Sequence, residues 1–282
     1  MIVKLSELLK QAKKEKYGIP AFAVEDENCM RSAIKAAEQM KSPLIVLAGF
    51  KEYSTEQELD DLDFRTHSFL HYCEKSSVPI ALVRDHTYKF EDAVIGVKVG
   101  FQCIMADRSK LPFEENVQQV KEIVKICHSA NVDVEAELGH VGLGLDLQKD
   151  ANVFTVPEEA AAYVEATGCD CLAVSIGNAH GLYKGTPKLD FDLLEQIVQK
   201  VDIPLVLHGA TGIPEEDVTK ACSMGICKIN VGTDTYMACR DGVQGADLSG
   251  AKVYGVFDAM YNSYMDVIKH WMTITGSAGK AK

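Results

Sequence analysis

The sequence lacks any run of about 18 consecutive apolar residues, the length that a membrane-spanning helix requires. Residues 1–16 mix Lys and Glu with Leu and contain no apolar core of the kind found in secretion signals. Basic residues are in deficit, because 29 Lys and Arg face 41 Asp and Glu, for a formal net charge of −12. Such a charge repels phosphate backbones. We therefore expect a cytoplasmic protein with neither a membrane nor a nucleic acid as its partner.

The nine cysteines show neither a Cys-x-x-C pair nor a regular spacing, and their odd number leaves at least one unpaired. The nearest two are Cys169 and Cys171. We expect all nine to be reduced thiols, as is usual in the cytoplasm.

No linker, repeat or low-complexity tract divides the chain, and its 47% hydrophobic and 25% charged residues are typical of a soluble globular protein. A length of 282 residues suits two domains of about 150 residues or one α/β barrel of about 250. We expect one domain over residues 1–282.

Short apolar runs rich in Val and Ile alternate with longer amphipathic segments. The predicted strands are Ile19–Val24, Pro43–Ala48, Val78–Val83, Gln102–Ala106, Val132–Leu138, Asp170–Ile176, Ile203–Leu207 and Cys227–Val231. The helical patterns between them include Asn28–Met40, Phe113–Ala130, Pro157–Thr167, Asp192–Val201 and Pro214–Met224. Eight buried strands, each followed by a helix, predict a closed (β/α)8 or TIM barrel. An open doubly wound sheet stays an alternative, although no Gly-x-Gly-x-x-Gly follows the first strand.

A helical extension is expected after the eighth unit, at about residues 250–275, where Tyr254–Met272 has a helical pattern. The active site of a barrel lies at the carboxyl ends of its strands. Polar residues gather at those predicted ends, namely Asp85, His86, Asp107–Ser109, Glu135, Glu137, Asn178–Gly181, His208 and Asn230–Thr233.

Three of the eight histidines, His86, His180 and His208, come just after predicted strands. Three imidazoles with one open position suit a catalytic zinc ion, although they would also suit Co²⁺ or Fe²⁺. Glu137 is a candidate fourth or alternating ligand. The alternative is that each histidine is only a hydrogen-bonded polar residue, and Glu137 only a barrel-lining carboxylate.

The loops after the seventh and eighth predicted strands are rich in small residues, which let backbone N–H groups approach an anion. This pair of loops is the usual phosphate site of the fold. The candidate phosphate contacts are Gly209, Ala210, Thr211, Asn230, Val231, Gly232 and Thr233, with Gly181 and Lys184 in a neighbouring loop. Each loop alone could also be a simple tight turn.

Asp85 precedes the candidate ligand His86 and is the best candidate for a general acid and base. A carboxylate in this position could instead support His86 by a hydrogen bond.

With these residues in view, the chain resembles the class II, metal-dependent ketose-bisphosphate aldolases, most closely those of fructose and tagatose bisphosphates. The resemblance is carried by Tyr17–Phe22, Asp85-His86, Val134–Gly139, His180–Gly185, Pro204–Gly212, Lys228–Val231 and Gly276–Lys280. It implies that His86, His180 and His208 hold one zinc ion per subunit, and that Asp85 moves the proton of the C4 oxygen. Gly181, Gly209–Thr211 and Asn230–Thr233 would contact dihydroxyacetone phosphate. The implied reaction is reversible aldol cleavage of the C3–C4 bond of a phosphorylated ketose. Family members are dimers or tetramers, and a monovalent cation near the phosphate is compatible with the resemblance.

The departures from the family pattern matter as well. Ala23 stands where the family usually has Asn, and Leu145 stands where a mobile loop usually carries a glutamate that moves the proton on the dihydroxyacetone phosphate carbon. Leucine cannot move a proton, so Asp146, another carboxylate or water would have to replace it. Arg84 and Arg108 are additions at neighbouring strand ends. We hypothesise that one or both arginines bind an anionic group on the aldehyde half, where Asp107 is a further candidate for specificity; the alternative is that the arginines pair with carboxylates at the rim.

Three further alternatives stay open. A sister enzyme would use an unusual aldehyde, and a retired barrel would bind a sugar phosphate without cleaving it. A Schiff-base aldolase would need a desolvated lysine, and Lys228 is the nearest one, although it is expected to open its strand away from the catalytic rim.

Overall fold

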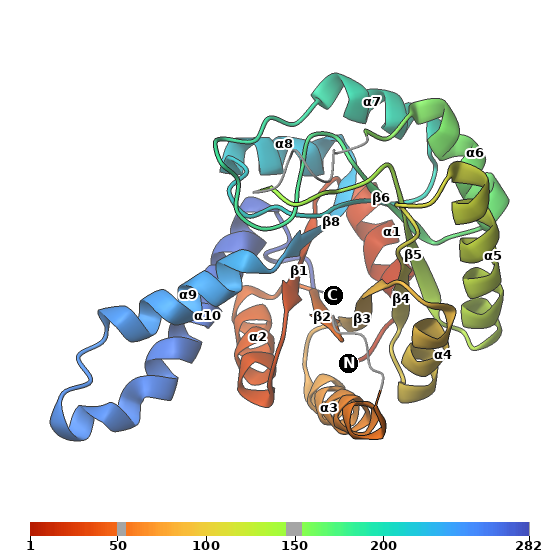
Figure 1. Ribbon diagram of the computed structural model, residues 1–282. Coiled ribbons are helices and arrows are strands. Elements are labelled where there is room, and N and C mark those ends of the chain that lie inside the picture. The colour runs from red at the N-terminus through yellow and green to blue at the C-terminus, as the bar shows by residue number, and fades with distance from the viewer. Residues whose placement is uncertain (50–54, 145–153, 282) are drawn as a thin grey trace.

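The computed structural model describes residues 1–49, 55–144 and 154–281 (Figure 1). Its eight strands pair in parallel and in sequence order to form a closed barrel, which confirms the predicted TIM barrel. The strands are β1 Ile19–Ala23, β2 Leu44–Ala48, β3 Ile80–Thr87, β4 Cys103–Ala106, β5 Asp133–Leu138, β6 Cys171–Val174, β7 Leu205–Leu207 and β8 Ile226–Val231. The helices are α1 Leu5–Glu15, α2 Glu27–Met40, α3 Glu56–Lys75, α4 Phe90–Val99, α5 Phe113–Ser129, α6 Pro157–Thr167, α7 Phe191–Lys200, α8 Glu215–Met224, α9 Thr233–Gly245 and α10 Val256–Ile274, with the 3-10 helix η1 Gly250–Gly255.

The third strand differs most from its prediction. It continues to Thr87 rather than ending at Val83, because Val83, Arg84 and Thr87 pair with residues 103, 104 and 106 of β4. Asp85 and His86 therefore lie within the strand, not in a loop after it.

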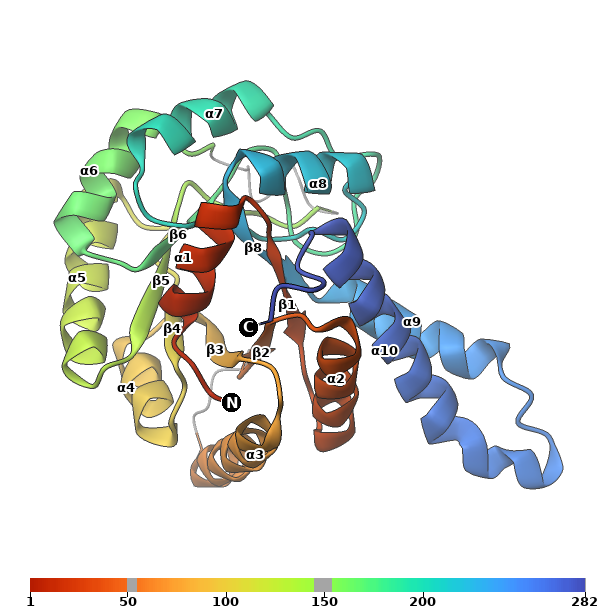
Figure 2. The same cartoon turned by 180° about the vertical axis from the view of Figure 1, so that it is seen from behind.

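Two layers of apolar residues make up the core. One fills the space between barrel and helices, and the other fills the barrel interior with small side chains such as Ala21, Ala81 and Ala173. Helix α1 lies across the amino-terminal end of the barrel and packs Leu5 and Leu9 onto this inner layer (Figures 1 and 2). Helix α1 thus covers the amino-terminal end of the barrel.

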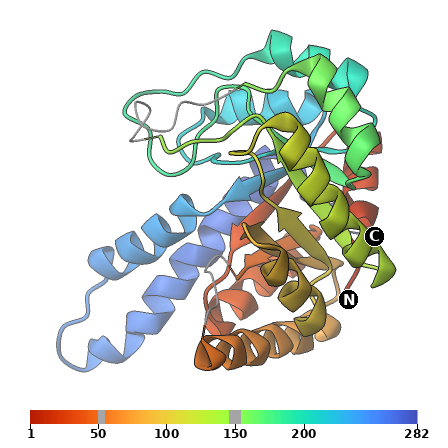
Figure 3. The same ribbon diagram turned by 45° about the vertical axis from the view of Figure 1, so that its right-hand side comes forward.

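Helices α9 and α10 form an arm that projects from the barrel (Figures 1 and 3). Helix α10 packs against α9 and α2, and the Trp271 indole N–H donates to Asp234 at 2.9 Å. The extra helix expected at about residues 250–275 is thus present. No helix among the described residues is both long and apolar enough to cross a membrane. All nine cysteines are free thiols, and the expectation of one domain over residues 1–282 stays a prediction.

Candidate active site

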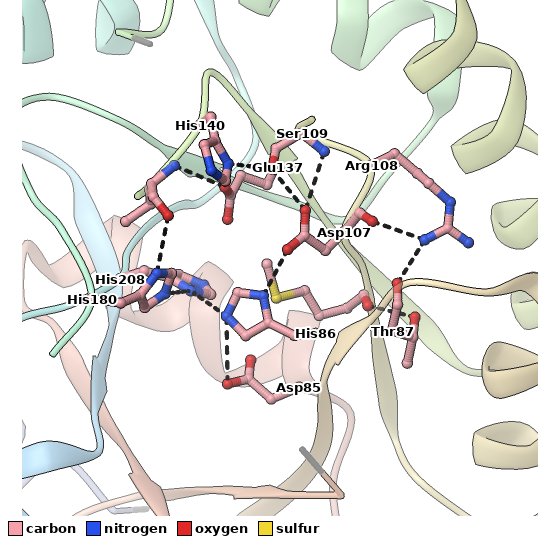
Figure 4. Close-up of polar contacts among 12 residues, drawn as sticks. Asp85, His86, Thr87, Asp107, Arg108, Ser109, Glu137, His140, His180 and His208 are labelled. Atoms are coloured by element: carbon pink, nitrogen blue, oxygen red, sulfur yellow. Dashed lines mark hydrogen bonds and ion pairs between the residues drawn. The ribbon is translucent and has the colours of Figure 1, made fainter. Parts of the chain in front are cut away.

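His86, His180 and His208 meet at the carboxyl end of the barrel (Figure 4). They come from β3, from the loop after β6 and from the residue after β7. His208 Nδ1 lies 3.3 Å from His86 Nε2 and 3.3 Å from His180 Nε2. The strand-end rule thus brings together three residues that are far apart in the sequence.

The outer nitrogen of each imidazole faces a hydrogen-bond acceptor. His86 Nδ1 lies 2.8 Å from Asp107 Oδ2, His180 Nδ1 lies 3.1 Å from the Val141 carbonyl oxygen, and His208 Nε2 lies 2.8 Å from Glu135 Oε1. A neutral imidazole that donates at one nitrogen carries a lone pair at the other. When all three imidazoles are neutral, the nitrogens that face one another present lone pairs, and a shared cation would remove their repulsion.

The spacing of these nitrogens suits a divalent metal. Tetrahedral zinc with Zn–N bonds of about 2.0–2.1 Å separates its ligand nitrogens by about 3.3–3.4 Å, close to the 3.3 Å separations observed here. Glu137 Oε2 is buried without a hydrogen-bond partner in the described part of the chain. The Glu137 carboxylate also forms a second possible metal-binding group with His86 and Asp107. The residues present therefore fit a divalent cation.

Carboxylates dominate the electrostatics around His86. Burial alone would lower the pKa of His86, but Asp85, Asp107 and Glu137 raise it to about 9. Burial and the neighbouring imidazoles lower the pKa of His180 to about 4. The three carboxylates supply the negative charge that a bound divalent cation would need.

The backbone of β3 brings two consecutive side chains to this site. Side chains alternate between the two faces of a regular strand, so Asp85 and His86 should diverge. However, the pairing of β3 with β4 is irregular between Arg84 and Thr87, and His86 has a φ of 45°. Bulges and left-handed residues of this kind re-aim side chains at active sites. Asp85 is 5% exposed, and Asn230 Nδ2 lies 3.3 Å from Asp85 Oδ1.

A cavity of about 240 Å³ joins His86 and His180 to the predicted phosphate loops. Its lining comprises Ala23, Leu47, Asp85, His86, His180, Gly181, Gly209, Ala210, Thr211, Asn230, Gly232, Thr233 and Tyr236. Helix α9 begins at Thr233, and the Asp234 N–H donates to Thr211 Oγ1 at 3.2 Å. A helix N-terminus beside glycine-rich turns attracts an anion because its first N–H groups have no partner within the helix.

Two predicted phosphate contacts do not line this cavity. The Val231 side chain is fully buried in the core outside the barrel. Lys184 is exposed in its loop and is absent from the lining. Val231 could reach a ligand only through its backbone.

The positions of Arg84 and Arg108 contradict the hypothesis that they bind an anion at the rim. Arg84 lies on the outer face of β3, is 1% exposed and pairs with Asp92 at 3.4 Å. Arg108 donates to the carbonyl oxygens of Thr87 and Asp107 and to Gln119, and Figure 4 shows it turned away from the histidines. Neither guanidinium lines the cavity. The hypothesis failed because strand alternation sends Arg84 outward when Asp85 points inward.

Asp107 lies in the histidine cluster and also lines a second cavity beside His86. Its carboxylate binds His86 and also accepts from the Ser109 hydroxyl at 2.8 Å. These bonds hold the pKa of Asp107 well below its usual range, although burial alone would raise it.

Sequence reasoning missed His140 and the supporting role of Glu135. The Ser109 hydroxyl lies 3.0 Å from His140 Nδ1, and His140 lines a second cavity of about 290 Å³ beside His86. Glu135 lies two residues before Glu137 on β5, so the alternation of a strand already places both on one face. Burial alone would raise the pKa of Glu135, but Lys228 and His208 lower it to about 2. Leu145 and Asp146 lie outside the described residues.

Comparisons with known proteins identify the family of the chain. The family model "Fructose-bisphosphate aldolase class-II" matches residues 3–280. The YdjI aldolase of Escherichia coli K12 is similar in structure, with a TM-score of 0.88, 31% identity and 100% coverage of both chains. A putative fructose-1,6-bisphosphate aldolase from Coccidioides immitis has a TM-score of 0.88 and 28% identity, over 98% of this chain and 97% of that one.

The fructose-bisphosphate aldolase of Campylobacter jejuni has a TM-score of 0.84 over 99% of this chain and 97% of that one, and its 21% identity supports the fold alone. The match to the family model covers nearly the whole chain. The chain therefore belongs to the class II fructose-bisphosphate aldolases, a family of metal-dependent lyases.

Proposed function

We propose that the protein is a zinc-dependent aldolase that reversibly cleaves a phosphorylated ketose into dihydroxyacetone phosphate and an aldehyde. Fructose and tagatose 1,6-bisphosphates are the default substrates, and glyceraldehyde 3-phosphate would then be the aldehyde. The observation that carries the proposal is the single cavity that joins a metal-compatible histidine cluster, a buried carboxylate and a phosphate cradle.

We propose the following roles for the residues of the site. His86, His180 and His208 would hold the zinc ion, with Glu137 as an alternate ligand. When bound, zinc would supply an electrophile for the ketone oxygen. The amides of Gly181, Gly209–Thr211 and Gly232–Thr233 would bind the phosphate.

Asp85 would move the proton of the substrate's C4 hydroxyl. During cleavage its carboxylate accepts that proton while the C3–C4 bond breaks and the C4 carbonyl forms. The electron pair of the broken bond stays on the dihydroxyacetone phosphate carbon, which then takes up a proton. In synthesis Asp85 returns its proton to the C4 oxygen. Asn230 supports this role, because its amide N–H groups face both carboxylate oxygens at 3.3 and 3.4 Å.

A sister specificity for another aldehyde is the second candidate. Ala23, Leu47 and Tyr236 line the cavity beside Asp85 and present largely apolar surface there. Ala23 replaces the Asn usual in the family, and the similar YdjI protein is described only as an aldolase.

The proposal also includes the setting in which the enzyme acts. We place it in the cytoplasm as a single-domain subunit of a homodimer or homotetramer. Val253, Tyr254 and Phe257 are 50, 86 and 63% exposed near the end of the arm. Exposed apolar side chains grouped in this way favour a contact between subunits.

The test is release of dihydroxyacetone phosphate from fructose and tagatose 1,6-bisphosphates, measured with EDTA and after zinc is added back. We expect release that EDTA abolishes and zinc restores, and the preferred epimer identifies the substrate. Two results together would refute the metal mechanism: release that survives EDTA, and trapping of an enzyme–substrate Schiff base by borohydride. A zinc-loaded protein that cleaves only other ketose phosphates would favour the sister specificity, and one that cleaves none would indicate a retired barrel.

A further inference from the structure

Lys228 lies inside the barrel, directly beneath the proposed active site. It is the third residue of β8, its side chain is fully buried, and it does not line the cavity. Its ammonium group lies 2.8 Å from Glu135 Oε2, 3.0 Å from Glu135 Oε1 and 2.7 Å from Asn230 Oδ1. Lys228 thus lies near the start of its strand and below the catalytic rim, and this location argues against a Schiff base with substrate.

Two chains of hydrogen bonds lead from this ammonium group to the site. The first runs through Glu135, whose Oε1 accepts from His208 Nε2 at 2.8 Å. The second runs through Asn230, whose Nδ2 lies 3.3 Å from Asp85 Oδ1. One side chain thus reaches both a proposed metal ligand and the proposed acid and base.

We propose that Lys228 is a positioning residue that aligns His208 and Asp85 at the same time. The inference rests on the proposed function, because it assigns a role within that site. It depends on geometry alone: an ammonium group is a hydrogen-bond donor only, so each group that it touches must turn an acceptor toward it.

The hydrogen-bond chain through Asn230 shows how this constraint works. An amide can present either its oxygen or its nitrogen to a neighbour, and the two differ by a half turn of the side chain. Lys228 selects the orientation with Oδ1 toward the ammonium group, which leaves Nδ2 to donate to Asp85. Without Lys228 the amide could flip and set its oxygen against the Asp85 carboxylate.

The hydrogen-bond chain through Glu135 acts on His208, the proposed metal ligand. Glu135 and Lys228 are both fully buried, so each depends on the other for its opposite charge. Held in this place, the carboxylate keeps the Nε2–H of His208 directed at Oε1 and leaves Nδ1 facing the other histidines. Partners of this kind fix the orientation of metal-binding histidines.

The experiment compares three variants with the wild-type enzyme. Lys228→Met removes the ammonium group from both hydrogen-bond chains. The double variant Glu135→Gln/Lys228→Met removes both charges and keeps an amide oxygen for His208, so it avoids an uncompensated buried carboxylate. Arg84→Met is the matched control, because it also removes a buried cation from an ion pair, with Asp92, but outside the barrel.

Zinc affinity, kcat, KM and thermal stability are measured for each variant. For Lys228→Met we expect zinc affinity to fall about 10- to 100-fold, the range for lost supporting partners of metal ligands. For the double variant we expect near wild-type zinc affinity and an unchanged KM but a kcat lower by about 10-fold or more, because Asn230 no longer holds Asp85. Arg84→Met should lose thermal stability while zinc affinity and kcat stay within about twofold of wild type.

The double variant decides the outcome even if Lys228→Met fails to fold. A folded double variant with wild-type kcat would overturn the inference, as would Lys228→Met with wild-type zinc affinity. If the wild-type enzyme cleaves no ketose phosphate, the proposed function fails. The zinc affinities still test separately whether Lys228 positions His208 through Glu135.

Discussion

Gly209 is the position where a single methyl group should do most damage to the site. Its φ is 65°, and a Cβ placed there would lie 1.9 Å from the Ala179 carbonyl oxygen, 2.4 Å from its carbon and 2.9 Å from the His180 nitrogen. All three atoms belong to the backbone that carries His180. An alanine at this position therefore cannot be accommodated by a side-chain rotation.

The size of the effect follows from these contacts. Real Cβ atoms essentially never come closer than 3.0 Å to another heavy atom, so the Ala179 carbonyl oxygen must move from 1.9 to at least 3.0 Å, a shift of about 1.1 Å. A misplacement of about 1 Å in an active site can cost about 10²-fold in rate. The left-handed backbone adds about 1–2 kcal/mol of strain for any residue with a Cβ. We expect Gly209→Ala to lower kcat/KM about 100-fold and to weaken zinc binding.

Gly212→Ala is the control, because Gly212 has a φ of 89° but its nearest neighbour would be a Tyr183 ring carbon at 3.4 Å, an ordinary contact. It should carry the left-handed strain alone and lower Tm by about 2–8 °C. The assays are zinc competition with a chromogenic chelator, kcat/KM for the ketose phosphate and thermal unfolding. If Gly209→Ala matches Gly212→Ala in zinc affinity and kcat/KM, the contact with the Ala179–His180 backbone does not position His180.

Three further predictions concern single side chains. Asp85→Asn should lower kcat about 10²- to 10⁴-fold, the usual contribution of a general acid and base, while zinc affinity changes little; a parallel loss of zinc would make Asp85 a metal support instead. Arg108→Met should leave the ratio of KM values for charged and neutral aldehydes unchanged, because the guanidinium is held by Thr87, Asp107 and Gln119; a changed ratio would restore the anion-binding hypothesis. Cys239 is half-buried, and a hydrogen bond from Cys29 lowers its pKa, whereas burial raises the pKa of Cys73, Cys127, Cys169 and Cys222 to about 12. Native protein should therefore react rapidly with about one equivalent of Ellman's reagent at pH 8, and Cys239→Ser should abolish that phase; an unchanged rapid phase would place the reactive thiol elsewhere.

The barrel and the convergence of the candidate site residues could be predicted because both depend on local patterns. Each strand is a short apolar run with its own helix, and a closed parallel barrel brings all the strand ends to one rim. His180 and His208 follow their strands closely enough for this rule to find them. The partners of the histidines could not be predicted in the same way. Lys228 and Glu135 are 93 residues apart, and only the order and stagger of the strands decide that they meet.

The segment Arg84-Asp85-His86 shows where local patterns stop being sufficient. Alternation in a regular strand would send Arg84 and His86 to one face and Asp85 to the other. Arg84 obeys this rule and lies outside the barrel, and its adjacency to two site residues made it look functional. His86 breaks the rule because the irregular pairing between Arg84 and Thr87 and its own left-handed backbone turn it back toward the site.

A left-handed conformation costs a non-glycine residue about 1–3 kcal/mol and persists where its surroundings hold it. Here the hydrogen bond from His86 Nδ1 to Asp107 at 2.8 Å holds the ring from β4. The strain at His86 is therefore tied to the convergence of the three histidines: a regular strand would relieve it and would remove one of the three nitrogens from the cluster. Nothing in the residue types from 84 to 87 encodes that bulge, so it could be recognised only once β3 and β4 were paired.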